Sequence, residues 1–127
     1  MTNRAVISTP DAPEAIGPYS QAIKVGNTVW LSGQIPLIPG SMELVTGDIG
    51  DQARQVFTNL AAVAEAAGGS LNHAVKMNIS LTNLDHFAAV NEVMASFLQE
   101  PYPARACVQV AALPKGVDIE VEAILAI

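Results

Sequence analysis

The sequence predicts one α+β domain over residues 1–127, in which two helices cover one face of a mixed sheet and the elements follow the order β-β-β-α-β-α-β-β. Its 127 residues suit one domain with a single core. Two segments repeat apolar residues every three or four positions, as amphipathic helices do, and several shorter ones alternate apolar and polar residues, as half-buried strands do. Two helices on one face are the simplest cover for so much apolar strand surface.

Three strands are expected first. Residues Arg4–Ser8 form a short strand that ends before two closely spaced prolines. Ala22–Val25 and Thr28–Ser32 flank the pair Gly26 and Asn27, a two-residue connection typical of tight hairpins. Residues 34–47 hold two prolines and two glycines, so we expect an irregular connection there.

The first helix is predicted over Asp48–Ala67. Either Asp48 or Asp51 can cap its start, and Gly68 and Gly69 can end it because glycine accepts a left-handed backbone. Its apolar stripe consists of Ala53, Val56, Leu60, Val63, Ala64 and Ala67.

Another strand and the second helix follow. The strand is predicted over His73–Leu81, and the helix over Leu84–Leu98 with Asn83 or Asp85 as its cap. The inward positions are expected to be Val75, Met77, Ile79 and Leu81 in the strand, and Phe87, Val90, Met94 and Phe97 in the helix. The last two strands are predicted at about residues 104–110 and 118–127.

Charge and composition exclude several classes of protein. The net charge is −6 and the six Lys and Arg residues are scattered along the sequence, so binding to the phosphate backbone of a nucleic acid is disfavoured. Only 14% of the residues are charged, against about 25% in a typical soluble domain, which favours an oligomer over an Ala-rich monomer. The single cysteine requires no oxidising compartment, residues 1–4 begin no signal peptide, and no apolar run approaches the ~18 residues of a membrane span. We therefore predict a soluble, cytoplasmic protein.

Motifs for a metal or a nucleotide are missing from the sequence. Two histidines and one cysteine, widely separated, do not give zinc-ligand spacing. Gly68 and Gly69 follow a predicted helix, whereas a dinucleotide fingerprint follows a strand. We expect no metal and no cofactor, and chemistry by protein groups and water.

Arg105 is the most informative single residue. It lies in a predicted strand among apolar and small residues, so we expect it to point into a recess, where its planar guanidinium suits a carboxylate. Alternation places Arg105, Cys107 and Gln109 on one face of this strand, and Glu120 and Glu122 on one face of the last strand. If the two strands pair and these faces coincide, Arg105 and Glu120 border one recess. The alternative is a cross-strand salt bridge of Arg105 with Glu120 or Glu122.

The other candidate residues each have an ordinary structural interpretation. Cys107 could be a nucleophile, but neither His73 nor His86 is placed as its base, so a half-buried structural thiol is favoured. Tyr19 and Ser32 could be ordinary hydrogen-bonded residues beside glycines. An asparagine in mid-helix, such as Asn91, usually faces solvent.

A family resemblance changes the weight of these alternatives. Residues 103–124 read Pro-Ala-Arg-Ala-Cys-Val-Gln-Val-Ala-Ala-Leu-Pro-Lys-Gly-Val-Asp-Ile-Glu-Val-Glu-Ala-Ile. Further blocks at residues 16–22, 31–36, 52–55 and 65–68 stand upstream in the same register. Together they resemble the signature of the RidA (YjgF) family of enamine/imine deaminases, over nearly the whole chain.

The resemblance implies a fold similar to a chorismate mutase subunit and a homotrimer with sites between subunits. It also implies hydrolysis of 2-aminoacrylate/2-iminopropanoate and 2-iminobutanoate to 2-oxo acids and ammonia. By resemblance, Arg105 holds the substrate carboxylate and Glu120 positions water. Tyr19 lines the pocket, Ser32 and Gly33 contact the reacting end, Asn91 reaches in from the second helix, and Cys107 binds through its backbone. A non-catalytic sensor of small carboxylates, or a protein-interaction trimer, is the alternative.

Overall fold

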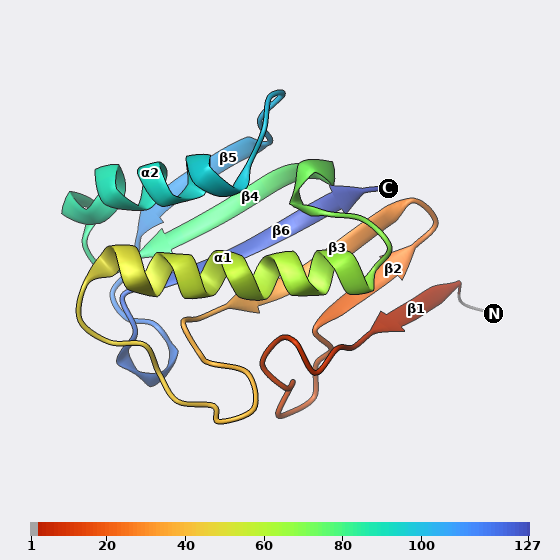
Figure 1. The fold of residues 1–127 in the computed structure, drawn as a ribbon, viewed down its shortest axis with the longest axis horizontal. Helices are drawn as coiled ribbons and strands as arrows, with labels where there is room; N and C mark the ends of the chain where they lie inside the picture. The colour runs from red at the N-terminus through yellow and green to blue at the C-terminus, as the bar shows by residue number, and fades with distance from the viewer. Residues whose placement is uncertain (1–2) are drawn as a thin grey trace.

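A mixed sheet of six strands forms the platform of the molecule, with the spatial order β1-β2-β3-β6-β4-β5 (Figure 1). The computed structural model describes residues 3–127, so residues 1–2 of the predicted domain lie outside the described part. The strands are β1 (Arg4–Ile7), β2 (Ala22–Val25), β3 (Thr28–Gln34), β4 (Ala74–Leu81), β5 (Ala104–Gln109) and β6 (Ile119–Ala126). Strands β4 and β5 are parallel, whereas the other neighbouring strands are antiparallel.

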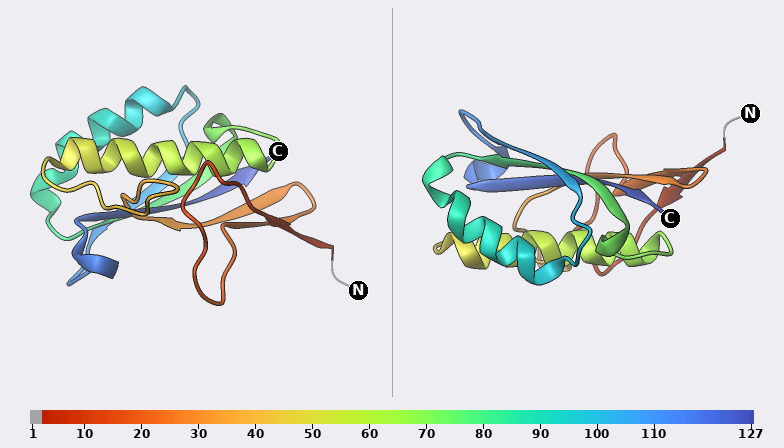
Figure 2. Two further views of the ribbon diagram at one scale, coloured as in Figure 1. Left: turned by 60° about the horizontal axis from the view of Figure 1, so that its bottom comes forward. Right: turned by 90° about the horizontal axis from the view of Figure 1, so that it is seen from above.

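Helices α1 (Ile49–Ala66) and α2 (Phe87–Phe97) both lie on one face of this sheet (Figure 2). Short 3-10 turns precede β4, α2 and β6, at Leu71–His73, Leu84–His86 and Pro114–Gly116. The predicted element order and the placement of both helices are therefore confirmed. In the views of Figure 2, neither α1 nor α2 covers the opposite face of the described sheet, where only the short turn Pro114–Gly116 is drawn as a helix.

The core lies between the helices and the sheet. The α1 residues Val56, Phe57 and Leu60 are fully buried against inward residues of the strands such as Met77 and Val121. Strand β6 alternates along its whole length between this core face and the open face, and β4 does so from Lys76 onward, as the period of two requires.

Local turn chemistry follows the sequence closely. Gly26 has φ +57° in the β2–β3 hairpin, and Gly68 has φ +94° just after α1, as the predictions for both turns required. Asn83 caps the turn before α2, with its side-chain oxygen accepting from Asp85 N at 2.9 Å. Asp48 is the N-cap residue of α1, but its side chain makes no capping hydrogen bond, so that part of the prediction is wrong.

Two details of the sheet differ from the sequence prediction. Val75 is 48% exposed, because an irregularity in the pairing of β4 with β6 between Ala74 and Lys76 shifts the alternation, and Ala74 takes the inward position. More importantly, β5 and β6 do not pair: β4 lies between them. This separation changes how the candidate residues can meet.

Candidate functional site

Glu120 lies in the larger of two cavities that hold candidate residues. This cavity has a volume of about 640 Å³ and opens on the sheet face that the helices leave uncovered. Four residues singled out from the sequence line it together: Tyr19, Ser32, Gly33 and Glu120. The structure thus brings into one place residues from a loop, from β3 and from β6.

Gly33 gives the Glu120 carboxyl its position. The pairing of β3 with β6 is irregular between Leu31 and Gln34, and within this bulge the Glu120 side chain lies directly against the Gly33 backbone. The space that a side chain on Gly33 would take is the space that the carboxyl fills. The special feature of Gly33 is therefore close approach rather than a turn, since a side chain at this position would have to displace the Glu120 carboxyl.

Burial and the neighbouring Glu122 raise the pKa of the Glu120 carboxyl above its usual value. Burial is the larger cause, because it removes water from the charged form, and repulsion by Glu122 adds to it. A carboxyl whose pKa moves toward neutrality is better suited to exchange protons than an ordinary surface carboxylate. Perturbed acids of this kind gather at functional sites.

The cavity walls are fixed by buried polar contacts. Ser32 Oγ donates to Ser20 O at 2.6 Å, and the buried Gln21 amide donates to Pro13 O at 2.8 Å, so both hold the loop that carries Tyr19. On the other side, Asn59 of α1 donates to Leu37 O at 2.8 Å. Ser32 thus has a structural role in addition to lining the cavity.

Met42 and Lys115 also line this cavity, and neither was expected from the sequence. They are the two non-glycine residues with positive φ among residues 3–127, at +59° and +58°. Side chains other than glycine rarely adopt this conformation, and it concentrates at functional sites. No sequence signal marks either position, because neither is glycine or asparagine.

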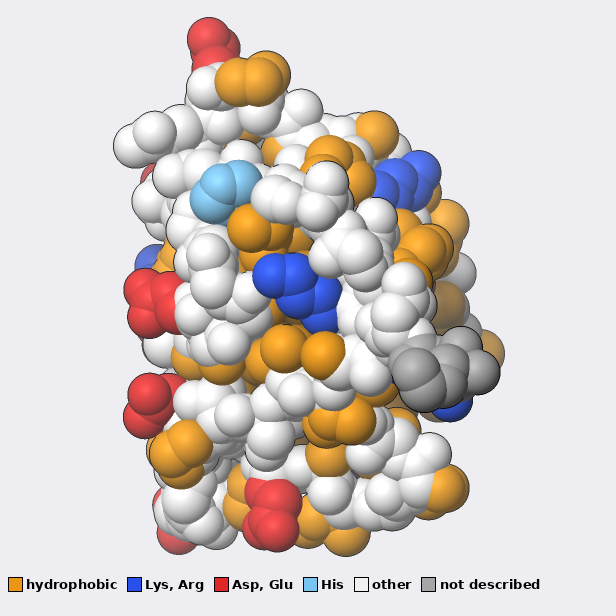
Figure 3. All heavy atoms as spheres, turned by 90° about the vertical axis from the view of Figure 1, so that its right-hand side faces the viewer, with side chains coloured by type: hydrophobic (Ala, Val, Ile, Leu, Met, Phe, Trp, Pro, Cys, Tyr) orange, Lys and Arg blue, Asp and Glu red, His pale blue; other side chains and the backbone are white. Residues whose placement is uncertain are grey.

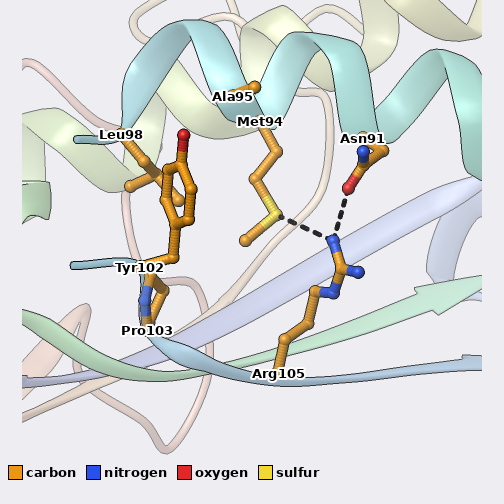
Figure 4. A pocket seen from close by; sticks show the side chains of 7 residues that line it. All are labelled: Asn91, Met94, Ala95, Leu98, Tyr102, Pro103 and Arg105. Carbon is orange, nitrogen blue, oxygen red and sulfur yellow. Dashed lines mark hydrogen bonds between the residues drawn. The ribbon is translucent and has the colours of Figure 1, made fainter. Parts of the chain in front are cut away.

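Arg105 lies in a second cavity, of about 480 Å³, between β5 and α2 (Figure 4). Its Nη1 donates to Asn91 Oδ1 and also contacts Met94 Sδ at 3.9 Å, as the dashed lines in Figure 4 mark. Its Cζ lies 5.1 Å from the centre of the Phe87 ring. Asn91 therefore points at Arg105 and not simply into solvent.

Arg105 and Glu120 face opposite sides of the sheet. In the sheet register, Arg105 pairs with Met77 of β4, whose side chain is on the core face. Glu120 pairs with Ser80 of β4, whose side chain is on the open face. The condition under which Arg105 and Glu120 would border one recess, paired strands with coinciding faces, is not met within one chain, and the alternative of a cross-strand salt bridge is wrong. The one ion pair in the described part of the chain joins Arg54 and Asp51, which leaves Arg105 without a carboxylate partner there.

Cys107 follows Arg105 on the core face of β5, level with Ile79. Burial raises the pKa of its thiol, and the charge of Arg105 only partly opposes this, so the thiol is not activated as a nucleophile. Its backbone is a better candidate for binding. Because Val110 N donates to Leu81 O, the alternation of strand hydrogen bonds points the N–H of Cys107 away from β4, toward the free edge of the sheet.

Phe87 and Met94 beside Arg105 were interpreted only as core residues in the sequence. With Asn91 they occupy positions i, i+4 and i+7 of one helix stripe. This spacing, with an asparagine in the middle of an apolar stripe, is the signal that could have predicted a helix face directed at a polar partner.

Three features relevant to other ligand classes are clustered cations, metal-ligand groups and membrane-spanning helices. On the face shown in Figure 3, the Lys and Arg side chains stand apart from one another among uncharged and hydrophobic atoms. Within residues 3–127, no group of three or more His, Cys, Asp and Glu side chains could hold a metal ion. None of the helices described is long and apolar enough to span a membrane.

Comparison with known proteins gives a consistent picture. Residues 9–127 match the family model described as Endoribonuclease L-PSP. The chain is 52% identical to a protein named 2-iminobutanoate/2-iminopropanoate deaminase from Dermatophagoides farinae, over all of this chain and 99% of that protein. It is 47% identical to the mouse protein of the same name, over 95% of this chain and 90% of that protein.

Solved structures agree with these sequence matches. RidA from an Antarctic Psychrobacter species superimposes with a TM-score of 0.93 at 59% identity, covering 97% of this chain and 99% of that one. TdcF from E. coli with bound serine superimposes with a TM-score of 0.92 at 45% identity, covering 97% and 98% of the two chains.

Proposed function

Because this chain belongs to the RidA (YjgF) family, whose family model is described as Endoribonuclease L-PSP, we propose that it hydrolyses small 2-imino acids and their enamine tautomers. The reaction takes 2-iminopropanoate or 2-iminobutanoate and water to the 2-oxo acid and ammonia. The observation that carries the proposal is a guanidinium that Asn91 holds and that has no carboxylate partner within residues 3–127, in a protein that also has a half-buried carboxyl with a raised pKa.

Arg105 is the group that binds the substrate carboxylate. Its Nη1 is engaged by Asn91, so the Nε and Nη2 edge is left for two parallel hydrogen bonds to a carboxylate. The serine in the related TdcF structure carries such a carboxylate, which supports this assignment. The outward N–H of Cys107 is available to the same group.

Glu120 handles water and protons. It orients water toward carbon 2, takes the proton that water loses on attack, and passes it to the nitrogen, which gives a carbinolamine. The carbinolamine hydroxyl then gives its proton to Glu120, which passes it to the nitrogen; the carbon–oxygen double bond forms as the carbon–nitrogen bond breaks, and ammonia leaves. The raised pKa of its carboxyl suits both directions of proton transfer. The substrate is already electrophilic, so holding it against the water is the main requirement.

One substrate cannot reach both groups in a single chain. Its carboxylate and its imine carbon are adjacent atoms, whereas Arg105 and Glu120 lie on opposite faces of the sheet, with β4 between their strands. A second copy of the chain can supply the missing group. The proposed site therefore combines Arg105 of one subunit with Glu120 of the next.

The surface supports this assembly. Arg105 is on β5, the edge strand, where another subunit can approach. The uncovered sheet face that holds Glu120 exposes apolar side chains, with Trp30 at 53% and Val108 at 51%. Large exposed apolar residues grouped on one face favour a protein interface. An edge-to-face contact is heterologous, and such contacts form a closed ring when the rotation between subunits allows it; a trimer is the ring that the family resemblance implies.

The other properties predicted from the sequence fit this proposal. A cytoplasmic location is part of it, because the single cysteine requires no oxidising compartment. RNA cleavage, which the name of the family model suggests, is disfavoured by the net charge of −6 and the separated cations.

A coupled assay tests the activity. Threonine dehydratase generates 2-iminobutanoate, and the appearance of 2-oxobutanoate is followed with and without this protein while semicarbazide competes for the imine. Acceleration of 2-oxobutanoate release is expected. Calorimetric binding of 2-oxobutanoate without any acceleration would instead favour the carboxylate sensor.

Assembly is tested separately. Light scattering at micromolar concentration is expected to give three times the chain mass of 13.3 kDa. The single Trp30 gives a second readout, since dilution that dissociates the trimer exposes it and shifts its fluorescence to the red. A mass near one chain contradicts the proposed intersubunit site.

A further inference from the structure

Helix α2 holds the guanidinium of Arg105 from three positions of one stripe. Phe87 places its ring centre 5.1 Å from Cζ, Asn91 accepts from Nη1, and Met94 contacts Nη1 through sulfur at 3.9 Å. Figure 4 shows the last two side chains descending from α2 toward Arg105. These contacts determine which part of the guanidinium is left for a ligand.

The free part of the guanidinium is its Nε and Nη2 edge. The contacts with Asn91 Oδ1 and Met94 Sδ both use Nη1. Within residues 3–127, no hydrogen bond involves Nε or Nη2 of Arg105. Asn91 fixes only one nitrogen, which leaves the guanidinium plane free to rotate about that bond. A flat aromatic surface near Cζ restricts this rotation, because a guanidinium prefers to lie against an aromatic face.

We propose that Phe87 is a positioning residue for Arg105: its ring orients the guanidinium before the ligand arrives, so that the Nε and Nη2 edge faces the substrate carboxylate. This inference rests on the proposed role of Arg105 as the carboxylate clamp. Arginine is a flexible side chain, and Arg105 is exposed, so ordering it only on binding would weaken affinity. Phe87 lowers that cost without touching the substrate.

The ring of Phe87 is itself fixed relative to β5. The turn Leu84–His86 leads directly into α2, and Leu84 N donates to the Gln109 side-chain oxygen at 3.0 Å. Gln109 is on the same strand and the same face as Arg105. Phe87 is also partly buried against the core. The start of α2, which carries Phe87, is therefore held against β5, the strand that carries Arg105.

The test compares Phe87→Leu, Phe87→Tyr and the matched control Phe97→Leu. Phe97 is the other aromatic residue of α2, and it packs on Phe57 with ring centres 5.6 Å apart, inside the core. Calorimetry measures the Kd of 2-oxobutanoate and of its neutral amide, 2-oxobutanamide, and a melting curve follows each variant. Phe87→Leu is expected to weaken binding of the acid about two- to fivefold, the usual size of an exposed cation–aromatic contact, and to leave the amide unchanged.

Phe87→Tyr is expected to restore acid binding, because it keeps the ring. Phe97→Leu should lower the melting temperature and leave both Kd values unchanged. Equal weakening of acid and amide by Phe87→Leu, or no weakening, overturns the positioning role. So does a wild-type protein that binds no 2-oxobutanoate. If the acid-specific loss is found but the dehydratase assay shows no acceleration, the deaminase proposal fails while the role of Phe87 stands.

Discussion

A Cβ atom built on Gly33 would lie 2.9 Å from Cδ of Glu120 and 3.0 Å from its Oε2. Side chains in folded proteins do not approach so closely, so the carboxyl group occupies its place only because residue 33 has no side chain. The position of the proposed proton-transfer group therefore depends on a β-bulge in a neighbouring strand.

Gly33→Ala is expected to displace Glu120 and reduce turnover at least about tenfold, because proton transfer depends steeply on placement. Binding of 2-oxobutanoate to Arg105 should change little. The coupled assay and calorimetry measure the two effects.

Gly26→Ala is the matched control. Its φ of +57° makes alanine costly, but no atom lies within 4 Å of a Cβ at this position in the β2–β3 turn. It should lower the melting temperature and preserve turnover. Full activity of Gly33→Ala would show that the carboxyl need not sit where the structure has it.

Glu120→Gln retains size and some hydrogen bonding but removes the base. We expect turnover to fall by about 10²-fold or more, the usual contribution of a positioned acid–base group. Binding of 2-oxobutanoate is expected to survive, since Arg105 makes no contact with Glu120 in its own chain. A parallel loss of affinity and rate would count against a separate catalytic role.

The same substitution is expected to change stability in a pH-dependent way. The folded pKa of Glu120 lies above its unfolded value, so its ionisation destabilises the folded state. At pH 7–8, Glu120→Gln should therefore melt at a higher temperature than the wild type. The gain should shrink as pH falls through the folded pKa and vanish below the unfolded pKa of about 4.3.

Melting curves from pH 3.5 to 8 measure this difference, with Glu65→Gln, an exposed carboxylate of α1, as the background change. A constant offset between Glu120→Gln and the wild type at every pH would mean that burial of the charge is not its cause.

The element order could be predicted from the sequence because periodicity and turn residues act locally. The order of strands in the sheet could not be read in the same way. The segment β4-α2-β5 forms a parallel crossover through a helix, which places β5 at the sheet edge beyond β4, and β6 then enters between β3 and β4. Insertion of one strand between two others is set by long-range packing, so the sequence left open whether β5 and β6 pair, and the structure shows that they do not.

For the candidate residues, too, the sequence predicted their identity but not their arrangement in space. Tyr19, Ser32, Gly33 and Glu120 were each named from the sequence, and the fold gathers them in one cavity. Arg105 faces the core side of the sheet because it pairs in register with Met77 of β4. Alternation along β5 alone cannot predict this register, because it depends on the neighbouring strand. The walls contributed by Met42 and Lys115 depend on backbone conformations that their residue types do not favour.

Arg105→Lys keeps the charge but loses the two-point fork. The guanidinium gives Nη1 to Asn91 and keeps Nε and Nη2 for the carboxylate, whereas the single nitrogen of a lysine ammonium cannot donate two parallel hydrogen bonds from separate atoms. We expect a strong loss of turnover, at least about tenfold, with the trimer intact by light scattering. Unchanged deaminase activity in this variant would remove the clamp role.

The two impaired variants, Arg105→Lys and Glu120→Gln, together test where the site is formed. If Arg105 of one subunit works with Glu120 of the next, a trimer that mixes Arg105→Lys and Glu120→Gln subunits contains some interfaces with both native residues. With equal amounts and random assembly, about a quarter of the interfaces in a closed ring are of this kind. Mixing the two impaired proteins by joint unfolding and refolding is therefore expected to restore about a quarter of wild-type activity.

Each variant refolded alone is the control, and it should remain impaired. A site built within one chain would give no recovery on mixing, because every chain then carries one defect. Recovery on refolding, but not on simple mixing of preformed trimers, would identify subunit exchange as the source of activity. Absence of recovery, with mixed trimers confirmed by native mass spectrometry, would contradict the pairing of Arg105 and Glu120 across subunits.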